Sequence, residues 1–322
     1  MRHAGTRVTV IIVNYRTADL TKLAALSALA DGADEVIIVD NNSDDGSLER
    51  FGSTLGSRTT VVMRDTNGGF GSGANTGARL ASGDILVFLN SDAKLKAGAL
   101  EALVAEAGMA DGRILVGPRV LEDDGRVQRS AGLLPKPDDL LVRGLGLHRV
   151  ARAVSLLPGI GGLLGRSRMA AEYNTTLTAA SPADVSMISG ACVAVGRAAF
   201  ETMGGFDERY FMYFEDADLC RRATALGWPV RYLPAAEVVH TGGASSTRNY
   251  QLGLLHGPAM VLYLKRWYGS PGGILALWIL ALRALWGIAA GRDEAPEALV
   301  GGARAYLAGR ITVRRPRSTP SP

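Results

Sequence analysis

The chain has 322 residues, 47% apolar and 20% charged, a composition typical of a globular protein that excludes a disordered one. That length allows a sizeable hydrophobic core in one large domain or two. Residues 257–322 contain nine Lys or Arg and three Asp or Glu, so this part carries +6 and the remainder −2. A basic and apolar C-terminal part favours an anionic membrane surface over nucleic acid as a partner.

The two cysteines, Cys192 and Cys220, form no CxxC pair. We therefore expect two buried, reduced thiols and neither a disulfide framework nor a zinc site. Met1–Arg7 leads directly into a strand-like run without the cleavage site of a signal peptide. This start predicts that the body of the protein stays in the cytoplasm.

Four apolar, β-branched runs alternate with helical patterns in the first 92 residues, which predicts a parallel sheet with crossover helices. The expected strands are 8–15, 35–40, 59–64 and 84–92, with helices over 21–29 and ending near residue 80. Ligands of such sheets bind beyond the carboxyl ends of the strands. Polar residues occupy three of those ends: Asn14 and Tyr15, Asp40, and Asn90 and Asp92.

A glycine-rich stretch spans residues 67–77, before the expected helix. It lacks the Gly-Lys-Ser/Thr of a phosphate-binding P-loop and matches the dinucleotide pattern G-x-G-x-x-G only loosely. A flexible surface turn is the alternative interpretation.

The middle of the chain is less regular. Residues 114–116 predict a strand, followed by a hairpin around 123–125. Residues 184–195 and 228–233 predict two further strands, the first leading into residues 198–203. Residues 136–175 differ in composition, being rich in Leu, Gly and Arg, and we expect a variable insertion there. It is either partly membrane-facing or an amphipathic segment packed on the body.

The C-terminal part, residues 257–322, is predicted to be a membrane-associating helical region after a catalytic domain of residues 1–256. Residues 271–290 approach the length of a membrane span, but Arg283 lies inside this stretch and an arginine in mid-span is costly. Trp278 and Trp286 beside basic residues favour a helix lying in the membrane interface, so we expect a peripheral anchor. The basic tail after Arg310 is predicted to be disordered.

Within residues 204–222, the three acids Glu215, Asp216 and Asp218 lie directly behind an aromatic-rich run. Apolar walls raise the pKa of a carboxyl by desolvation, which suits a proton acceptor. The alternative is an acidic first turn of a helix through Arg222 on a solvated surface.

Five segments occur in an order that resembles the nucleotide-sugar half of the family-2 inverting glycosyltransferases, over about residues 8–250. The segments are residues 10–15, 39–46, 67–77, 89–92 and 204–219, the last followed by His240 and Gly-Gly-Ala-Ser-Ser. The chain is most similar to the bacterial rhamnosyltransferase-like subgroup, which builds cell-wall or O-antigen polysaccharide. This resemblance implies the GT-A fold, an α/β architecture with a Rossmann-like, mostly parallel sheet flanked by helices.

The resemblance also implies a role for each matching residue. Asp216 would be the catalytic base with Glu215 beside it, and Asp92 and His240 would hold Mg²⁺ or Mn²⁺. Asp40 would accept a hydrogen bond from a pyrimidine N3–H of the donor. The implied donor-binding residues are Asn14, Tyr15, Asp40, Asn42, Asn67, Gly69, Phe70, Asn75, Asn90 and Ser91.

One position departs from the family pattern, because Asn90 stands where the first acid of the metal-binding D-x-D element is expected. A single carboxylate can still hold an oxygen-ligated cation together with diphosphate oxygens and water. The alternative for His240 is a buried structural histidine. The Q-x-x-R-W element of processive synthases is missing where it is expected, which indicates transfer of a single sugar.

The leading hypothesis is a metal-dependent transferase on the cytoplasmic face of the membrane, with a lipid-linked or polysaccharide acceptor. The resemblance favours dTDP-rhamnose as donor and a UDP-sugar as the second choice. Two hypotheses from other classes are a non-catalytic nucleotide-sugar-binding scaffold, favoured by Asn90, and a nicotinamide-dependent oxidoreductase, favoured by the glycine pattern.

Overall fold

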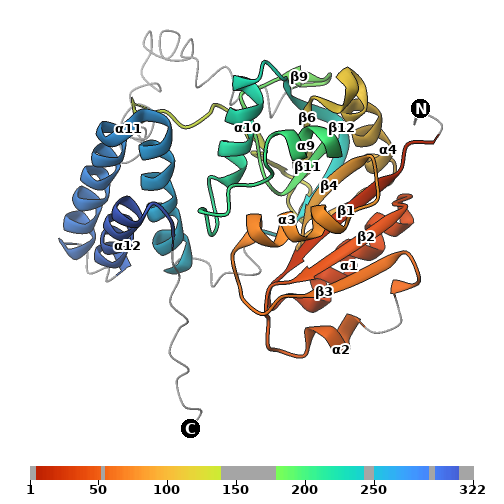
Figure 1. The fold of residues 1–322 in the computed structure, drawn as a ribbon, viewed down its shortest axis with the longest axis horizontal. Coiled ribbons are helices and arrows are strands. Elements are labelled where there is room, and N and C mark those ends of the chain that lie inside the picture. The colour runs from red at the N-terminus through yellow and green to blue at the C-terminus, as the bar shows by residue number, and fades with distance from the viewer. Residues whose placement is uncertain (1–4, 52–54, 139–178, 243–249, 290–293, 312–322) are drawn as a thin grey trace.

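The computed structural model describes residues 5–51, 55–138, 179–242, 250–289 and 294–311. A twisted sheet lies between two layers of helices, and a group of C-terminal helices packs beside this α/β body (Figure 1). The predicted insertion, residues 136–175, falls mainly outside the described residues, and so does the basic tail from residue 312.

The main sheet is mixed, with a parallel N-terminal half. Strands β3, β2, β1 and β4 run parallel to one another, whereas β11 is antiparallel to its neighbours β4 and β6. The order is β3-β2-β1-β4-β11-β6-β12-β5, with β7 on β6, β9 on β12 and a separate β10–β8 pair. The strands are β1 Val8–Asn14, β2 Glu35–Asp40, β3 Thr59–Met63, β4 Ile85–Asn90, β5 Ala93–Leu95, β6 Leu115–Leu121, β7 Val127–Gln128, β8 Ala131–Gly132, β9 Ala183–Asp184, β10 Met187–Ile188, β11 Cys192–Gly196 and β12 Val230–His240.

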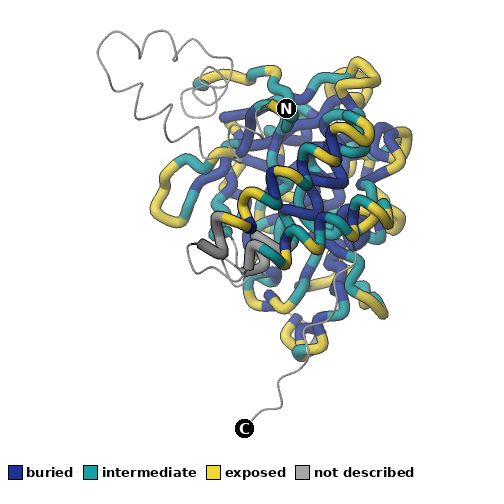
Figure 2. The backbone as a smooth tube through the Cα atoms, turned by 90° about the vertical axis from the view of Figure 1, so that its left-hand side faces the viewer, coloured by how far each residue is buried: buried dark blue, intermediate teal, exposed yellow. Residues whose placement is uncertain are grey.

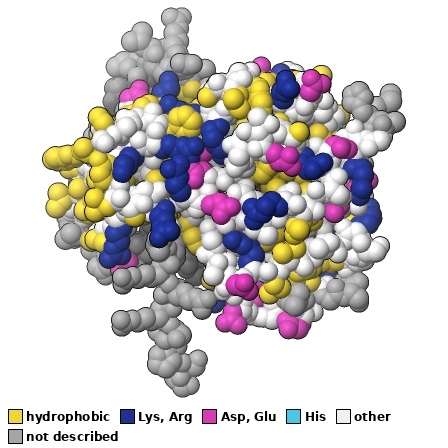
Figure 3. All heavy atoms as spheres, in the orientation of Figure 1, with side chains coloured by type: hydrophobic (Ala, Val, Ile, Leu, Met, Phe, Trp, Pro, Cys, Tyr) yellow, Lys and Arg dark blue, Asp and Glu magenta, His cyan; other side chains and the backbone are white. Residues whose placement is uncertain are grey.

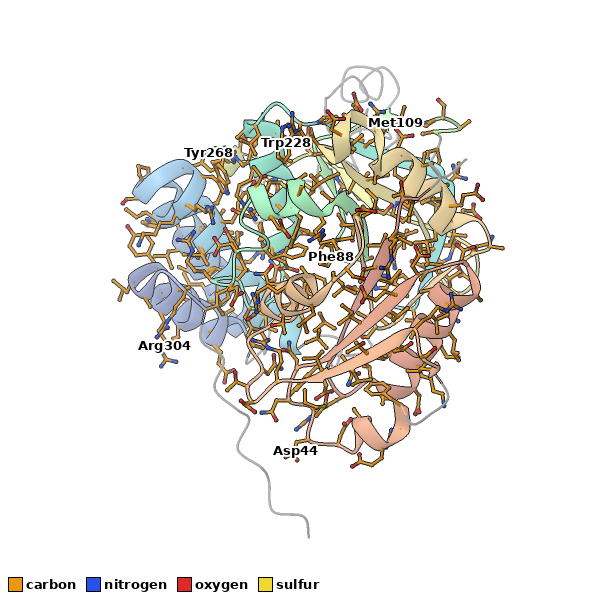
Figure 4. All side chains as sticks on the ribbon, turned by 45° about the vertical axis from the view of Figure 1, so that its right-hand side comes forward. Asp44, Phe88, Met109, Trp228, Tyr268 and Arg304 are labelled. Atoms are coloured by element: carbon orange, nitrogen blue, oxygen red, sulfur yellow. The ribbon has the colours of Figure 1, made fainter. Side chains whose placement is uncertain are left out.

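Helices cover both faces of this sheet. Helices α1 and α4 share one buried core with alternate residues of β1 and β4, and α3, α9 and α10 share the other. Phe88 lies at the centre of the second core, with its ring 4.8 Å from that of Phe200 and 5.1 Å from that of Phe206 (Figure 4). The helices are α1 Ala18–Ala30, α2 Ser47–Phe51, α3 Phe70–Leu80, α4 Ala99–Ala107, the 3₁₀ turn η2 Met109–Gly112, α9 Arg197–Thr202, α10 Glu215–Ala225, α11 Tyr250–Ala289 and α12 Glu294–Ala308.

The expected N-terminal strands and both buried, free cysteines are confirmed. Three details differ from the predictions. Residues 184–195 form three short strands, and residues 230–240 form one continuous strand with a register shift between Leu233 and Glu237. The glycine-rich stretch is the body of α3 and not a surface turn, because its glycines let the helix pack closely: a Cβ on Gly77 would lie 2.5 Å from Ile11.

Helix α11 crosses the predicted boundary at residues 256/257 and contains a break at Gly269, whose φ is +68°. Residues 259–264 pack against Tyr210, Phe214 and Ala217 of the α/β body. By length and composition, Leu255–Leu285 is apolar enough to cross a membrane, but the break at Gly269 divides that segment into two helices. In Figure 2 these C-terminal helices face the viewer, with exposed residues along their outer side.

Candidate active site

The carboxyl ends of three parallel strands meet in a buried polar network. Asn14 ends β1 and donates to Asp40 Oδ1, at the end of β2, over 2.6 Å. Thr17 connects this pair to the loop after β4, with its Oγ1 3.1 Å from Asn14 Oδ1 and 2.9 Å from Ser91 Oγ. Ser43 completes the network by donating its backbone N–H and its hydroxyl to Asp40. The strand ends therefore converge, as the topology predicts.

Asn14 and Asp40 form the floor of this region, because both residues are 0% exposed. All four of their side-chain polar atoms are bonded within the protein. A contact between Asp40 and a donor base stays a prediction: Oδ2 accepts only one bond here and has capacity for another, but the buried carboxylate has to become accessible first. Tyr15 and Asn42 lie above the floor and are only half-buried, so their side chains are the accessible ones.

Helix α3 connects the donor side of the site to the loop before α10. Gly69 is essential at this junction, because its φ is +86° and a Cβ there would lie 1.9 Å from the carbonyl oxygen of Phe211. Phe70 donates its N–H to that same oxygen over 3.0 Å. Asn75 is bonded to both backbone polar groups of Phe206, so its amide fixes the position of the loop. Asn67 accepts from the N–H of Gly69 at the start of the helix.

The two predicted metal ligands lie side by side. Asp92 Oδ1 is 3.2 Å from His240 Nε2, and Asn90 Nδ2 is 3.4 Å from the same nitrogen. Backbone pairing brings them together, because β5 directly follows Asp92 and pairs Ala93 with His240 of β12. The His240 side chain is 15% exposed, so it lies at the edge of the site.

The tautomer of His240 follows from its second contact. Gln128 Oε1 lies 2.9 Å from His240 Nδ1 and can only accept, so the ring hydrogen is on Nδ1. Nε2 then presents a lone pair to the Asp92 carboxylate, and two acceptors at 3.2 Å are stabilised by a proton or a cation shared between them. The pair therefore fits a divalent cation. No cluster of three or more His, Cys, Asp or Glu suited to a metal occurs among the described residues, so other ligands would come from the substrate or water.

The acids of the Phe-Glu-Asp segment occupy the first turn of α10, but this helix start is buried and not on a solvated surface. Tyr213 and Phe214 precede it in the left-handed region, with φ of 69° and 67°. This local conformation turns the chain sharply into the helix. Asp216 accepts two backbone hydrogen bonds, at 3.0 Å from Gly190 N and 2.7 Å from Ala217 N.

The environment affects the two adjacent carboxyls differently. Burial, together with the neighbouring Asp216 charge, raises the pKa of Glu215 to about 8. Burial also raises the pKa of Asp216, but the N–H groups of Gly190 and Ala217 oppose that shift. The N–H donors therefore favour the ionised form of Asp216 over that of Glu215.

A cavity of about 340 Å³ opens directly beside these carboxyls. Its walls come from the β7–β8 segment, β10, the start of α10 and the first half of α11. Arg129 contributes a basic group, whereas Leu133, Leu134 and Met187 contribute apolar surface. His256 of α11 also lines the cavity, and burial lowers the pKa of its imidazole to about 4, so the ring is neutral.

Two short segments join the metal-ligand pair to this cavity. Gln128 contacts His240, and the next four residues, 129–132, line the cavity with Asp216. Gly190 donates to Asp216, while the adjacent Ala191 accepts from the N–H of Asn90. The base candidate and the metal candidate are therefore linked by two short segments, while Asp92 and His240 are not among the residues that line the cavity.

Gln128 and His256 are site residues that the sequence analysis did not identify. Gln128 lies in a two-residue strand and belongs to no recognised motif. His256 precedes an apolar helix interpreted as a membrane anchor, so its position suggested no role in the site. The histidine was at least visible as one of only four in the chain.

Comparisons with solved structures define the class of protein by its fold. A mannosyltransferase from Pyrobaculum calidifontis in complex with GDP-Man and Mn²⁺ aligns with a TM-score of 0.53 and 18% identity, over 95% of this chain and 88% of that one. GalNAc-T7 with UDP, GalNAc and Mn²⁺ aligns with a TM-score of 0.52 and 14% identity, over 91% of this chain and 59% of that one. The fold is GT-A.

Sequence comparison then gives the family. The glycosyl transferase family 2 model matches residues 9–204, and a second model, glycosyl transferase family group 2, matches residues 164–300. The N-acetylglucosaminyl-diphospho-decaprenol L-rhamnosyltransferase of Mycobacterium tuberculosis is 32% identical over 239 residues, which are 70% of this chain and 73% of the relative. The chain belongs to glycosyltransferase family 2, in its rhamnosyltransferase-like subgroup. The oxidoreductase hypothesis is left without support, since the glycines behind it pack inside α3.

Proposed function

We propose that this protein is an inverting transferase that moves one rhamnose from dTDP-rhamnose to a lipid-linked sugar acceptor in cell-envelope polysaccharide synthesis. The observation that carries the proposal is that two short segments, 128–132 and 190–191, connect the Asp216 carboxylate at the cavity to the Asp92–His240 pair. Transfer needs a base on the acceptor side and charge neutralisation on the diphosphate side. This arrangement supplies both.

In the proposed step, Asp216 accepts the proton of the attacking acceptor hydroxyl. That oxygen forms a bond to the anomeric carbon of the donor sugar, while the bond from this carbon to the diphosphate oxygen breaks and its electron pair leaves with the nucleoside diphosphate. One base is sufficient for a single displacement, which inverts the anomeric configuration. The backbone N–H groups of Gly190 and Ala217 keep the carboxylate ionised and aimed.

Asp92 and His240 would hold a divalent cation, Mg²⁺ or Mn²⁺, which supplies Lewis-acid neutralisation of the departing diphosphate. Gln128 fixes the His240 ring so that Nε2 faces Asp92. Asn90 replaces a second carboxylate here, so the protein contributes one negative charge to this position.

The donor base and ribose would lie over the network of Asn14 and Asp40. Tyr15 and Asn42 offer accessible side chains there, and Asn67, Gly69 and Phe70 border the space at the start of α3. Asn75 would act indirectly, because its amide fixes the position of the loop at Phe206. Ser91 would lie with Asn90 beside the diphosphate of the donor. Its hydroxyl accepts a hydrogen bond from Thr17, which connects it to the network of Asn14 and Asp40.

The acceptor proposal rests on the mycobacterial relative, whose name gives N-acetylglucosaminyl-diphospho-decaprenol as its acceptor. A lipid-linked sugar diphosphate of this class suits an enzyme that reaches the membrane. A polysaccharide acceptor and a UDP-sugar donor are the second choices. The transfer assay therefore includes both of these substrates.

The C-terminal helices would bind the protein to the cytoplasmic face of the membrane as a peripheral anchor. Four large apolar side chains lie exposed along one side of the second half of α11: Ile274, Trp278, Leu282 and Leu285. Ala276, Ile279 and Leu280, on the other side of this half of the helix, are buried in the protein. The exposed apolar side chains therefore lie on the solvent-facing side of the helix. Figure 3 shows apolar side chains gathered at the edge formed by these helices. Together with the +6 charge of residues 257–322, this surface suits anionic lipid.

The test is a transfer assay with the purified full chain and a short-chain N-acetylglucosaminyl diphosphate lipid. We expect turnover with dTDP-rhamnose, loss of turnover in chelator, recovery with Mn²⁺ or Mg²⁺, and an inverted anomeric configuration in the product by NMR. Preference for a UDP-sugar would replace the donor assignment. Binding of sugar nucleotides without turnover for any acceptor would favour the scaffold hypothesis.

A further inference from the structure

Glu215 is a buried acid that the transfer step does not use. It is 7% exposed, and its Oε2 has no hydrogen-bond partner among the described residues. Leaving a buried polar atom unpaired costs about 1–3 kcal/mol, so such an atom needs an explanation. Glu215 also lines the cavity beside Asp216, where a bound molecule can supply the partner.

The contacts of the two adjacent carboxyls are unequal. Asp216 Oδ2 accepts from Gly190 N at 3.0 Å and Oδ1 accepts from Ala217 N at 2.7 Å, and donors of this kind favour the ionised form. Glu215 receives a backbone hydrogen bond from its own N–H, but its Oε2 has no partner among the described residues, and burial together with the Asp216 charge favours its neutral form. Two adjacent carboxyls in one apolar pocket do not both ionise near neutral pH.

We propose that Glu215 is the protonated member of this pair and donates its hydrogen to an oxygen of the acceptor sugar bound in the cavity. This inference rests on the proposed function, since it assigns the cavity to the acceptor. A neutral acid can donate a hydrogen bond beside the base without competing for the proton of the attacking hydroxyl. Its partner is a hydroxyl or carbonyl oxygen next to the attacking group.

The surroundings of the pair support this assignment. The titratable and charged groups that line the cavity with Glu215 are Asp216 on α10, Tyr213 on the preceding loop, His256 on α11 and Arg129 between β7 and β8. Burial lowers the pKa of His256 to about 4, so it adds no positive charge that would ionise Glu215. Arg129 is exposed and forms part of the rim. Burial and the Asp216 charge raise the pKa of Glu215 to about 8, consistent with a neutral acid at neutral pH.

Two substitutions separate the hydrogen-bond role from the protonation state. Glu215→Gln keeps a donor but cannot ionise, and we expect its turnover at pH 7 to stay within about threefold of wild type. Glu215→Leu lacks the donor, and we expect a KM for the short-chain N-acetylglucosaminyl diphosphate lipid raised about tenfold, with kcat changed less, since one hydrogen bond contributes ~1 kcal/mol. Wild-type activity should fall as the pH rises past about 8, whereas both variants should keep their activity there. Glu201→Gln, an exposed change on α9, is the matched control.

A second measurement needs no substrate. The folded-state pKa of Glu215 lies above its unfolded value, so the stability that it contributes is complete below about pH 4.5 and is lost as the pH rises through about 8. The wild type should therefore lose melting temperature over that interval relative to Glu215→Gln. Infrared difference spectra should contain a protonated carboxyl band that Glu215→Gln removes.

The experiments distinguish a failure of the Glu215 proposal from a failure of the proposed function. If wild type transfers no rhamnose, the donor or acceptor assignment fails, and the stability and infrared measurements still decide the protonation of Glu215. If Glu215→Gln is as inactive as a variant lacking the base, or shows the same alkaline decline as wild type, the proposal is wrong. An unchanged acceptor KM in Glu215→Leu would likewise overturn the hydrogen bond to the acceptor.

Discussion

The two sides of the site use carboxylates in opposite environments. Asp92 lies at the end of β4 in a network of polar side chains, next to His240, Asn90 and Gln128. Asp216 and Glu215 lie at the start of α10 under aromatic and aliphatic side chains from α11 and the preceding loop. The first environment suits a carboxylate that stays ionised and binds a cation. The second raises proton affinity, which suits groups that receive or keep a proton.

The difference comes from how each side is built. The polar side is positioned by backbone pairing between neighbouring strands, so its side chains follow from the sheet register. The apolar side depends on α11, which packs against α10 from the far end of the chain. Arg221 of α10 contacts the rings of both Trp267 and Tyr268, and Tyr268, labelled in Figure 4, directly precedes the break of α11 at Gly269. The base is therefore held in place by the helices that we assign to the membrane.

The largest effect is expected at the base. Asp216→Asn keeps the shape of the side chain but cannot accept a proton, so we expect kcat to fall by about a hundred- to ten-thousandfold. Donor binding, followed by thermal shift with dTDP-rhamnose and Mn²⁺, should stay close to wild type. Turnover near the wild-type level would show that Asp216 is not the base. The apolar side of the site would then have no assigned proton acceptor.

The next effect concerns the contact between α10 and α11. Asp218 is fully buried and bonded to Arg222 at 2.8 Å and to Trp267 Nε1 at 2.9 Å. Asp218→Asn leaves the buried Arg222 charge without its counter-ion, so we expect a loss of about 3–5 kcal/mol in the free energy of unfolding. Urea denaturation measures this loss.

The matched control for Asp218 is Asp124→Asn, which breaks the exposed ion pair with Arg126. That change should leave the free energy of unfolding close to the wild-type value, because solvent screens this exposed pair. Equal effects of the two substitutions would mean that the contact between α10 and α11 is no stronger than a surface ion pair.

A smaller effect is expected on the metal side. Gln128→Ala removes the acceptor that orients His240, and loss of such a partner typically weakens metal binding by about 10–100-fold. Titration of Mn²⁺ in the presence of dTDP measures the affinity. Gln128→Glu keeps an acceptor at this position and should restore most of the binding. Unchanged affinity in Gln128→Ala would separate His240 from the cation.

The smallest effect is expected at the outer surface of α11. Trp278 and Leu285 are 63% and 66% exposed, and replacing both by Ser should reduce binding to vesicles containing phosphatidylglycerol about tenfold or more. Leu23→Ser on α1, where the side chain is 48% exposed, is the control and should leave vesicle binding unchanged. Equal binding by all three proteins would place the membrane contact elsewhere. Transfer to a water-soluble acceptor should not change in either variant.

Much of the α/β body was predictable because its signal is local. Buried parallel strands are continuous β-branched runs, so 8–15, 35–40 and 59–64 agreed closely with β1, β2 and β3. The convergence of the strand ends at Asn14, Asp40 and Asn90 also followed, because parallel strands end at one edge. Helix α3 was misjudged, since glycine lowers helix propensity while close packing against Ile11 and Phe211 requires it.

By itself, the sequence determined the family, the sheet and the identity of the acids, because ordered motifs and strand periodicity are properties of short segments. The tertiary structure decided which acid is better stabilised as a carboxylate: only folding places Gly190 beside Asp216 and leaves Glu215 Oε2 without a partner among the described residues. It also decided that α11 breaks at Gly269 and closes the cavity with His256. These properties depend on burial and on contacts between residues far apart in the chain, which local patterns do not encode.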